Sequence, residues 1–213
     1  MQPYDQPILI GTTNEDKSKK LCWLIEGLRL APKPLNMDLI KIPFEEDATS
    51  HRGNAEKKAL FYSQFTNDLV ITSDGGLIIP VLKNNWKSLK TKRFASLNAS
   101  DKERISSLLN IMSPFHGKSR IIAWQEAVAV AHNGTLLGLW EAKGREGVLL
   151  EEDNSKSNQP PGFWLHSLWF IPTFNLLYDE LSEQEKFRTY DPWSQIKPLI
   201  KIFFMNQAAE KLP

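Results

Sequence analysis

The sequence lacks most of the features that mark secreted, membrane-bound and nucleic-acid-binding proteins. Its 213 residues include one cysteine, Cys22, which excludes an internal disulfide framework and favours a reducing compartment. The 26 basic and 25 acidic residues nearly cancel, so no overall field attracts nucleic acid or an anionic membrane. No apolar run of about 18 residues predicts a membrane-spanning helix, and the polar N-terminus does not resemble a signal peptide. We therefore expect a cytoplasmic protein with neither nucleic acid nor a membrane as its partner.

Two common kinds of catalytic centre also find no support. The histidines at positions 51, 116, 132 and 166 are not spaced as metal ligands, and Cys22 has no partner motif, so a zinc site is not predicted. The sequence contains no Gly-x-Ser-x-Gly elbow, which argues against an esterase triad.

The apolar patterning predicts an α/β chain with a mixed sheet. Strands are predicted at residues 7–10, 35–42, 69–72, 119–132 and 135–142. Helices are predicted after the first strand, over residues 54–65, at the Ser-x-x-Glu capping boxes 100–103 and 182–185, and from Pro192. The last helix is expected to bury Ile196, Leu199, Ile200, Phe203 and Phe204. Because no long linker divides the chain, we expect one domain over residues 1–213, with a mobile loop at residues 151–161.

The loop after the first strand is the first candidate for phosphate chemistry. Residues 11–17 read Gly-Thr-Thr-Asn-Glu-Asp-Lys and lead into an apolar-periodic helix. Backbone N–H groups at a helix N-terminus attract anions, and Lys17 adds a full charge. The spacing of a Walker loop is absent. A capped surface helix with an exposed lysine is the alternative.

Asp74 is the second candidate, in the Ser-Asp-Gly-Gly segment that ends the buried strand 69–72. A carboxylate beside two glycines is well placed to hold Mg²⁺ or to activate water. Lys17 and Lys58 could then hold a polyphosphate. The alternatives are a turn residue that bonds its own backbone, for Asp74, and a solvated helix face, for Lys58. The nucleotide interpretation requires Lys17, Lys58 and Asp74 to converge.

The order of these motifs resembles the Ham1-type nucleoside-triphosphate pyrophosphatases, also called inosine triphosphate pyrophosphatases. The family's Thr-Gly-Asn-x-x-Lys, Glu-Asn-Ala-x-x-Lys-Ala and Asp-Asp-Ser-Gly-Leu segments correspond to residues 12–17, 53–59 and 73–77. Its Ser-Ala-Arg-Tyr-Ala, Gly-Phe-Gly-Tyr-Asp-Pro-Ile-Phe and Glu-Leu-Ser-x-x-Glu-Lys segments correspond to residues 91–95, 162–169 and 180–186. The matches are collinear over nearly the whole chain. The resemblance implies an elongated mixed β-sheet flanked by helices, with two lobes around a central cleft, as in Ham1 and Maf proteins.

The resemblance also implies a reaction and a set of site residues. Family members hydrolyse a nucleoside triphosphate to the monophosphate and pyrophosphate, usually a deaminated purine nucleotide such as inosine or xanthosine triphosphate. In this chain Asp74 would hold Mg²⁺ and act as general base, and Glu46 would be a second metal ligand. The implied substrate-binding residues are Thr12, Thr13, Asn14, Lys17, Lys58, Gly75, Trp164, His166 and Lys186. Family members are commonly dimers, so the resemblance implies a homodimer.

The sequence departs from the family at both halves of the implied site. Ser73 replaces the first aspartate of the family pair and Gly53 replaces a glutamate, which lowers the acidic density. Trp164 and His166 replace a glycine and an aspartate, and residues 190–192, Tyr-Asp-Pro, replace the Ser-His-Arg that reads the oxo edge of the purine. A buried acceptor facing a carbonyl would cost about 1–3 kcal/mol and abolish most of the preference for oxo-purines. The Asp-Pro pair is equally explained as the cap of the last helix.

Two hypotheses follow from these departures. The first is a divergent pyrophosphatase with altered base preference. The second is a catalytically degenerate relative that binds a nucleotide or a protein partner, with exposed aromatics around Trp164 and Trp169 as its docking surface. The enzyme is favoured, because one carboxylate with Mg²⁺ can still activate water.

Overall fold

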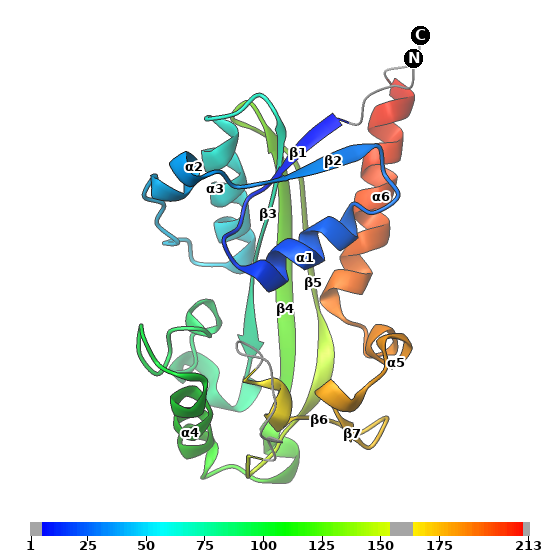
Figure 1. Cartoon of the computed structure of the whole chain (residues 1–213). Coiled ribbons are helices and arrows are strands. Elements are labelled where there is room, and N and C mark those ends of the chain that lie inside the picture. Colours follow the sequence, from blue (N-terminus) through cyan, green and yellow to red (C-terminus); the bar gives the residue numbers. More distant parts are fainter. Residues whose placement is uncertain (1–5, 154–163, 211–213) are drawn as a thin grey trace. The chain divides into compact units, whose positions relative to one another are not determined.

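A seven-stranded mixed sheet is the framework of the computed structural model, which describes residues 6–153 and 164–210 (Figure 1). The strand order is β2-β1-β3-β4-β5-β6-β7. The strands are β1 Gln6–Ile10, β2 Leu30–Pro34, β3 Leu69–Ile78, β4 Ile121–His132, β5 Thr135–Leu149, β6 Trp169–Ile171 and β7 Leu176–Leu177. Strand β1 pairs in parallel with β2 and β3, whereas β6 pairs antiparallel with β5 and β7. The predicted α/β class with a mixed sheet is confirmed.

Six α-helices are found among the described residues. They are α1 Glu15–Leu24, α2 Met37–Lys41, α3 His51–Ser63, α4 Asp101–Met112, α5 Glu183–Arg188 and α6 Pro192–Glu210. Short 3₁₀ turns lie at η1 Pro80–Asn85, η2 Ser88–Lys90, η3 Gly117–Arg120, η4 His166–Leu168 and η5 Tyr178–Glu180. Both predicted capping boxes are present, Ser100 with Glu103 and Ser182 with Glu185. None of the described helices combines the length and apolarity that crossing a membrane requires.

The chain divides into two compact units, and each is assembled from separate stretches of sequence. The first unit comprises residues 1–75, 126–142 and 192–213, and the second comprises residues 76–125 and 143–191. Strands β3, β4 and β5 therefore each contribute residues to both units. The expectation of one domain over residues 1–213 stays a prediction, and most of the loop predicted to be mobile, residues 154–161, lies outside the described residues.

The first unit buries both faces of its part of the sheet. Alternate strand residues point to opposite faces, as the pleat requires. One face packs with α1 and α6, which lie side by side, and contributes Ile8, Ile10, Ile71, Val128 and Val130 (Figure 1). The other face supplies Leu9, Val70, Ala127, Ala129 and Ala131, of which the three alanines share a cluster with Ala55 and Ala59 of α3. These small side chains allow α3 to approach the sheet closely.

The C-terminal helix α6 differs in one respect from its predicted pattern. Ile196 and Ile200 are fully buried as expected, but Leu199 is 46% exposed and Trp193 is buried instead. At 100° per residue, Leu199 lies about 90° from the centre of the stripe that Trp193, Ile196 and Ile200 form. The prediction that Leu199 is buried was therefore wrong, because its side chain lies beside the buried face of the helix and not on it.

The predicted strand at residues 35–42 was also wrong. The strand lies earlier, at β2, and residues 37–41 form the short helix α2. The side chain of Asn36 begins this helix by accepting a 2.8 Å hydrogen bond from the backbone N–H of Leu39. Strand β2 contains Pro32 and Pro34, which lack the N–H donor. It tolerates them because it is an edge strand, next to β1 in the strand order.

The second unit has its own apolar core, and Arg120 is one of its buried cations. Arg120 is 2% exposed and donates to four backbone carbonyls, those of Leu149 at 2.7 Å, Met112 at 2.6 Å, Phe115 at 3.0 Å and Leu150 at 2.6 Å. Burial lowers the pKa of Arg120. Its guanidinium thus joins the end of α4 to the end of β5 through the main chain.

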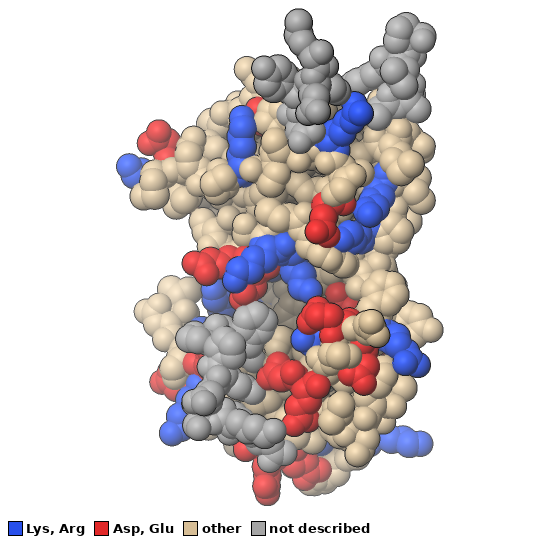
Figure 2. All heavy atoms as spheres, turned by 45° about the vertical axis from the view of Figure 1, so that its right-hand side comes forward, with Lys and Arg blue, Asp and Glu red and all other residues tan. Residues whose placement is uncertain are grey.

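The surface agrees with the nearly neutral composition. Figure 2 shows basic and acidic side chains together on the face that it draws, and the formal net charge of the sequence is +1. Neither the drawn surface nor the net charge indicates that a partner is attracted by an electrostatic field of one sign.

Candidate functional site

The loop between β1 and α1 is held by its own side chains. Asn14 begins α1, and its Oδ1 accepts hydrogen bonds from the backbone N–H groups of Asp16 at 2.9 Å and Lys17 at 3.1 Å. Thr12 Oγ1 accepts from the N–H of Asn14 at 3.1 Å. Two of the helix N-terminal amides that we expected to attract an anion are therefore already occupied by the cap.

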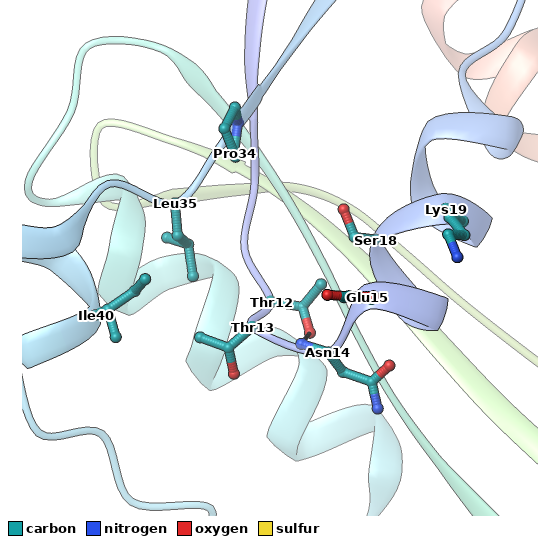
Figure 3. A pocket seen from close by; sticks show the side chains of 9 residues that line it. All are labelled: Thr12, Thr13, Asn14, Glu15, Ser18, Lys19, Pro34, Leu35 and Ile40. Carbon is teal, nitrogen blue, oxygen red and sulfur yellow. Dashed lines mark hydrogen bonds between the residues drawn. The ribbon is translucent and has the colours of Figure 1, made fainter. Parts of the chain in front are cut away.

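The same loop borders a pocket of about 370 Å³ in the first unit. Thr12, Thr13 and Asn14 lie between Leu35 and Ile40 on one side and Glu15 and Ser18 of α1 on the other (Figure 3). The lining residues are Thr12, Thr13, Asn14, Glu15, Ser18, Lys19, Pro34, Leu35 and Ile40. Lys17, Lys58 and Asp74 do not line this pocket.

Lys17 is placed between two carboxylates. Its Nζ lies 3.4 Å from Oε1 of Glu126 and 4.0 Å from Oδ1 of Asp74. Burial by itself lowers the pKa of Lys17, but the negative charges of Glu126, Asp74 and Glu46 outweigh it, and the pKa is raised. Lys17 is therefore a partly buried ammonium that stays charged at neutral pH. It lies at the Asp74 carboxylate, as the nucleotide interpretation requires.

Asp74 is held by two residues from the first turn of α3. His51 Nδ1 lies 2.8 Å from Oδ2 of Asp74, and Asn54 Nδ2 donates to the same oxygen at 3.2 Å. Oδ1 of Asn54 accepts from the backbone N–H of Ala48 at 3.0 Å, which fixes the orientation of the amide. Burial acts to raise the pKa of Asp74, but the bond to His51 and the charges of Lys17 and Lys58 lower it.

Lys58 and Glu46 complete this group. Lys58 Nζ lies 2.5 Å from Oε1 of Glu46. The charge of Lys58 also helps to lower the pKa of Asp74. We define the Asp74 cluster as Lys17, Glu46, His51, Asn54, Lys58, Asp74 and Glu126. All seven belong to the first unit, so four separate parts of the sequence, at Lys17, residues 46–58, Asp74 and Glu126, converge within one compact body.

The described residues only partly fit a magnesium ion. No group of three or more His, Cys, Asp or Glu side chains within residues 6–153 and 164–210 is placed to hold a metal. Mg²⁺, however, usually keeps several waters and needs only one or two carboxylates besides substrate phosphates. Asp74 fits as one such ligand through Oδ1. Glu46 fits as a second only if Lys58 releases it.

Packing explains why this chain has a glycine at position 53, where the family has a glutamate. A Cβ at Gly53 would lie 3.0 Å from Cβ of Ala48 and 3.2 Å from Oγ of Ser50, which caps α3. A glutamate there would crowd the cap. Ser73 is fully buried, and its Oγ makes no hydrogen bond to any described residue. Gly75 is half-buried at the end of this segment, and its predicted role in binding substrate stays a prediction.

The remaining predicted substrate residues lie in the second unit. His166 Nδ1 is 2.8 Å from Oδ1 of Asp179, and burial outweighs this contact to lower the pKa of His166. Lys186 Nζ bonds Glu183 at 2.9 Å and lies 5.8 Å from the ring centroid of Tyr178. The ring of His166 is 4.8 Å from that of Tyr178. His166 and Lys186 thus gather around one buried tyrosine.

The expectation of exposed aromatics in the second unit was wrong. Trp164 is 8% exposed, and its ring packs 5.9 Å from that of Phe94. Trp169 is fully buried. Both indoles belong to the apolar core of the unit, because their area is taken up against neighbouring side chains. They offer no surface on which a partner could dock.

Asp191 does not present a bare acceptor. It is 4% exposed, and its Oδ1 accepts from Nε of Arg145 at 3.1 Å and also from Nη2 of the same guanidinium. The carboxylate therefore faces a cation. The predicted cost of setting Asp191 against a purine carbonyl was based on an unpaired carboxylate and does not apply.

Sequence reasoning missed three residues of these clusters. Glu126 is a carboxylate, 1% exposed, inside the largely apolar strand β4, and this break in the pattern was the available signal. His51 was considered only as a metal ligand, although it lies one helical turn before Asn54. Arg145 gave no signal, because its partner is 46 residues away in the sequence.

Comparison with known proteins gives a consistent family. The model of the Ham1 family matches residues 8–189. The dITP/XTP pyrophosphatase of Desulforamulus reducens is 27% identical over 188 residues, which cover 84% of this chain and 86% of that protein. The dITP/XTP pyrophosphatase of Nautilia profundicola is 26% identical over 181 residues, covering 84% of this chain and 88% of that protein.

Solved structures share the fold. A HAM1 protein from Coxiella burnetii superposes with a TM-score of 0.75 at 22% identity, over 92% of this chain and 98% of that one. The Ham1 protein of Staphylococcus aureus gives a TM-score of 0.73 at 19% identity, over 97% of this chain and all of that one.

Proposed function

The chain belongs to the Ham1 family, and from this premise we propose that it is a nucleoside-triphosphate pyrophosphatase, a hydrolase that releases a nucleoside monophosphate and pyrophosphate. The observation that carries the proposal is the convergence of Lys17, Lys58 and Asp74 in the Asp74 cluster. The two ammonium groups suit the oxygens of a polyphosphate once it displaces Glu46 and Glu126, and the carboxylate of Asp74 suits a hydrolytic water. The activity for which the relatives are named, dITP/XTP pyrophosphatase, supports the same reaction class.

In the proposed reaction the lysines and Asp74 have different roles. The ammonium groups of Lys17 and Lys58 bind phosphate oxygens and neutralise the charge that grows on the leaving pyrophosphate. Asp74 stays ionised because its pKa is lowered, and it orients the attacking water and takes its proton. The water oxygen bonds to the α-phosphorus as the bond to the bridging oxygen breaks. Mg²⁺, with Asp74 as its protein ligand, would add Lewis-acid charge neutralisation.

We further propose that oxo-purine nucleotides are substrates. The departure at residues 190–192 argued against them partly because the carboxylate of Asp191 was taken to face the base. Because Arg145 pairs with that carboxylate, this part of the objection is removed, and the loss of the family's Ser-His-Arg donors remains. The triphosphates dITP and XTP, named for the relatives, are therefore the first to assay.

The test is pyrophosphate release from a panel of purine and pyrimidine triphosphates with Mg²⁺. We expect turnover of dITP or XTP, lost on chelation of the metal, and a fall of about 10²–10⁴-fold in kcat for Asp74→Asn. Asp68→Asn is the matched control, since Asp68 pairs only with the half-exposed Lys33 at 2.9 Å. Absence of turnover above the Asp74→Asn variant on every nucleotide would reject the proposal.

Binding without chemistry, the alternative drawn from the sequence, has lost one of its two supports. Trp164 and Trp169 are buried, whereas the absence of the family carboxylates at Gly53 and Ser73 remains in its favour. Calorimetry still separates the two functions. Nucleotide binding by the unmodified chain with no pyrophosphate release would restore the alternative.

A further inference from the structure

His51 makes a contact that the motifs of the sequence do not account for. It is the first residue of α3, is 4% exposed, and places Nδ1 2.8 Å from Oδ2 of Asp74. Asn54, three residues further on, donates to the same oxygen at 3.2 Å. Residues three apart on a helix lie on one face, so a single helical turn presents both groups to Asp74.

The two contacts have a geometric consequence for the carboxylate. With both groups on Oδ2, the carboxylate cannot rotate about its Cβ–Cγ bond without losing them. The other oxygen, Oδ1, is then the one that lies near Lys17, at 4.0 Å. The side chain of Asp74 is 12% exposed. The first turn of α3 thus fixes which oxygen is available for chemistry.

We propose that His51 is a positioning residue for the hydrolytic step, holding Asp74 so that Oδ1 is the oxygen presented to the attacking water. This inference rests on the proposed function. His51 acts through Asp74 and need not touch the substrate.

A purely structural role for His51 makes different predictions. If its only task were to fill space and satisfy a buried imidazole, its replacement would lower stability without a specific effect on turnover. If it positions Asp74, replacement lowers kcat more than it changes KM, because phosphate binding by Lys17 and Lys58 is left in place. Residues that orient an active-site ligand typically change activity about 10–100-fold when removed.

The experiment compares two replacements of different chemistry. In His51→Asn the amide nitrogen occupies nearly the position of Nδ1 and can still donate, whereas His51→Leu cannot. We expect His51→Leu to lower kcat about 10–100-fold with KM within about 3-fold, and His51→Asn to recover most of the loss. His116→Leu is the control, because the side chain of His116 is 70% exposed. Calorimetry with a non-hydrolysable dITP analogue is expected to give the same affinity for His51→Leu as for the unmodified chain.

The Asp74→Asn background gives the decisive comparison. If His51 acts through Asp74, adding His51→Leu to Asp74→Asn has no further effect on residual turnover. Multiplicative losses in the double variant, unchanged kcat in His51→Leu, or equal losses in His51→Asn and His51→Leu would each overturn the inference while the unmodified chain stays active. No turnover by the unmodified chain would instead remove the proposed function, and this inference with it.

Discussion

Arg145 and Asp191 form a buried ion pair in the second unit, in which Nε and Nη2 of one guanidinium share a single carboxylate oxygen. The guanidinium also lies over the ring of Tyr178, 4.3 Å from its centroid. Arg145 has a positive φ of 54°, and its N–H donates to the carbonyl of Thr189 at 3.0 Å. The pair and this backbone bond fasten the residues before α6 to strand β5.

Breaking this pair from one side is expected to be costly. Asp191→Leu leaves the guanidinium buried without its carboxylate, so we expect the free energy of unfolding to fall by about 3–5 kcal/mol. The double replacement Arg145→Met with Asp191→Leu removes both charges and should recover most of the loss. Urea unfolding measures all three. The exposed pair Lys33–Asp68 is the control, for which Asp68→Asn should cost about 1 kcal/mol or less. A single replacement as mild as the control would contradict the expectation.

Because Tyr178 is buried, we expect the free energy of unfolding to fall at alkaline pH. Burial raises its pKa from 10.0 to about 12, although the charge of Arg145 acts in the opposite direction. An acid whose pKa is raised in the folded state stabilises it fully below the unfolded pKa. This contribution, about 2–3 kcal/mol, is lost as the pH rises from about 10 through about 12. Denaturation at pH 9, 10 and 11 should show this decline in the unmodified chain. Tyr178→Phe should lack that component, and an identical pH dependence in the two proteins would exclude it.

Lys17 predicts a substrate-binding effect. Lys17→Met keeps most of the apolar stem of the side chain but removes the ammonium. The loss of a charge-assisted hydrogen bond of about 1.5–3 kcal/mol corresponds to a rise of about 10–150-fold in KM for the triphosphate. Steady-state kinetics with dITP or XTP measures it. Lys19→Met on the same helix is the matched control, since Lys19 is exposed and outside the Asp74 cluster. Equal effects of the two replacements would show that Lys17 contributes only general positive charge.

Gly76 predicts a steric effect next to the Asp74 segment. A Cβ at this position would lie 2.3 Å from the backbone carbonyl oxygen of Ser88, which cannot move independently of η2. We expect Gly76→Ala to lower the free energy of unfolding by about 1–3 kcal/mol. At Gly138 the nearest atom, also at 2.3 Å, is the far end of the Trp140 side chain, which can turn aside. Thermal or urea unfolding should therefore show a smaller loss for Gly138→Ala.

Local signals in the sequence predicted much of the fold. The capping boxes at Ser100 and Ser182 fix helix starts through bonds between residues three apart, so each is visible in a short window. The hairpin turn at Asn133 and Gly134 is equally local, with φ of 47° and 72°. The strand predicted at residues 35–42 failed because Asn36 caps a helix there, a competing local signal that the apolar residues masked.

The candidate site was likewise predictable only where the signal was local in the sequence. Lys17, Lys58 and Asp74 could be predicted to converge because each belongs to a recognisable motif, although Asp74 lies within β3 and not at the strand end predicted after residue 72. The contacts that complete the cluster join residues distant in sequence, such as Lys17 with Glu126 and His51 with Asp74. No window of sequence contains both partners, and their pairing depends on the register of β4 beside β3 and the placement of α3 on the sheet. The predicted homodimer and cytoplasmic location stay predictions.

The interrupted make-up of the first unit has a consequence for biosynthesis. Trp193, Ile196 and Ile200 occupy the same apolar cluster as Ile8 and Ile10, although nearly the whole chain separates them. A ribosome delivers these N-terminal strands long before the helix that covers them. Until that helix has emerged, the apolar face that it shields stays open to water, so the core of the first unit is complete only after residues 192–200 have been synthesised. A nascent chain stalled before residue 192 would be a client for chaperones and not an enzyme.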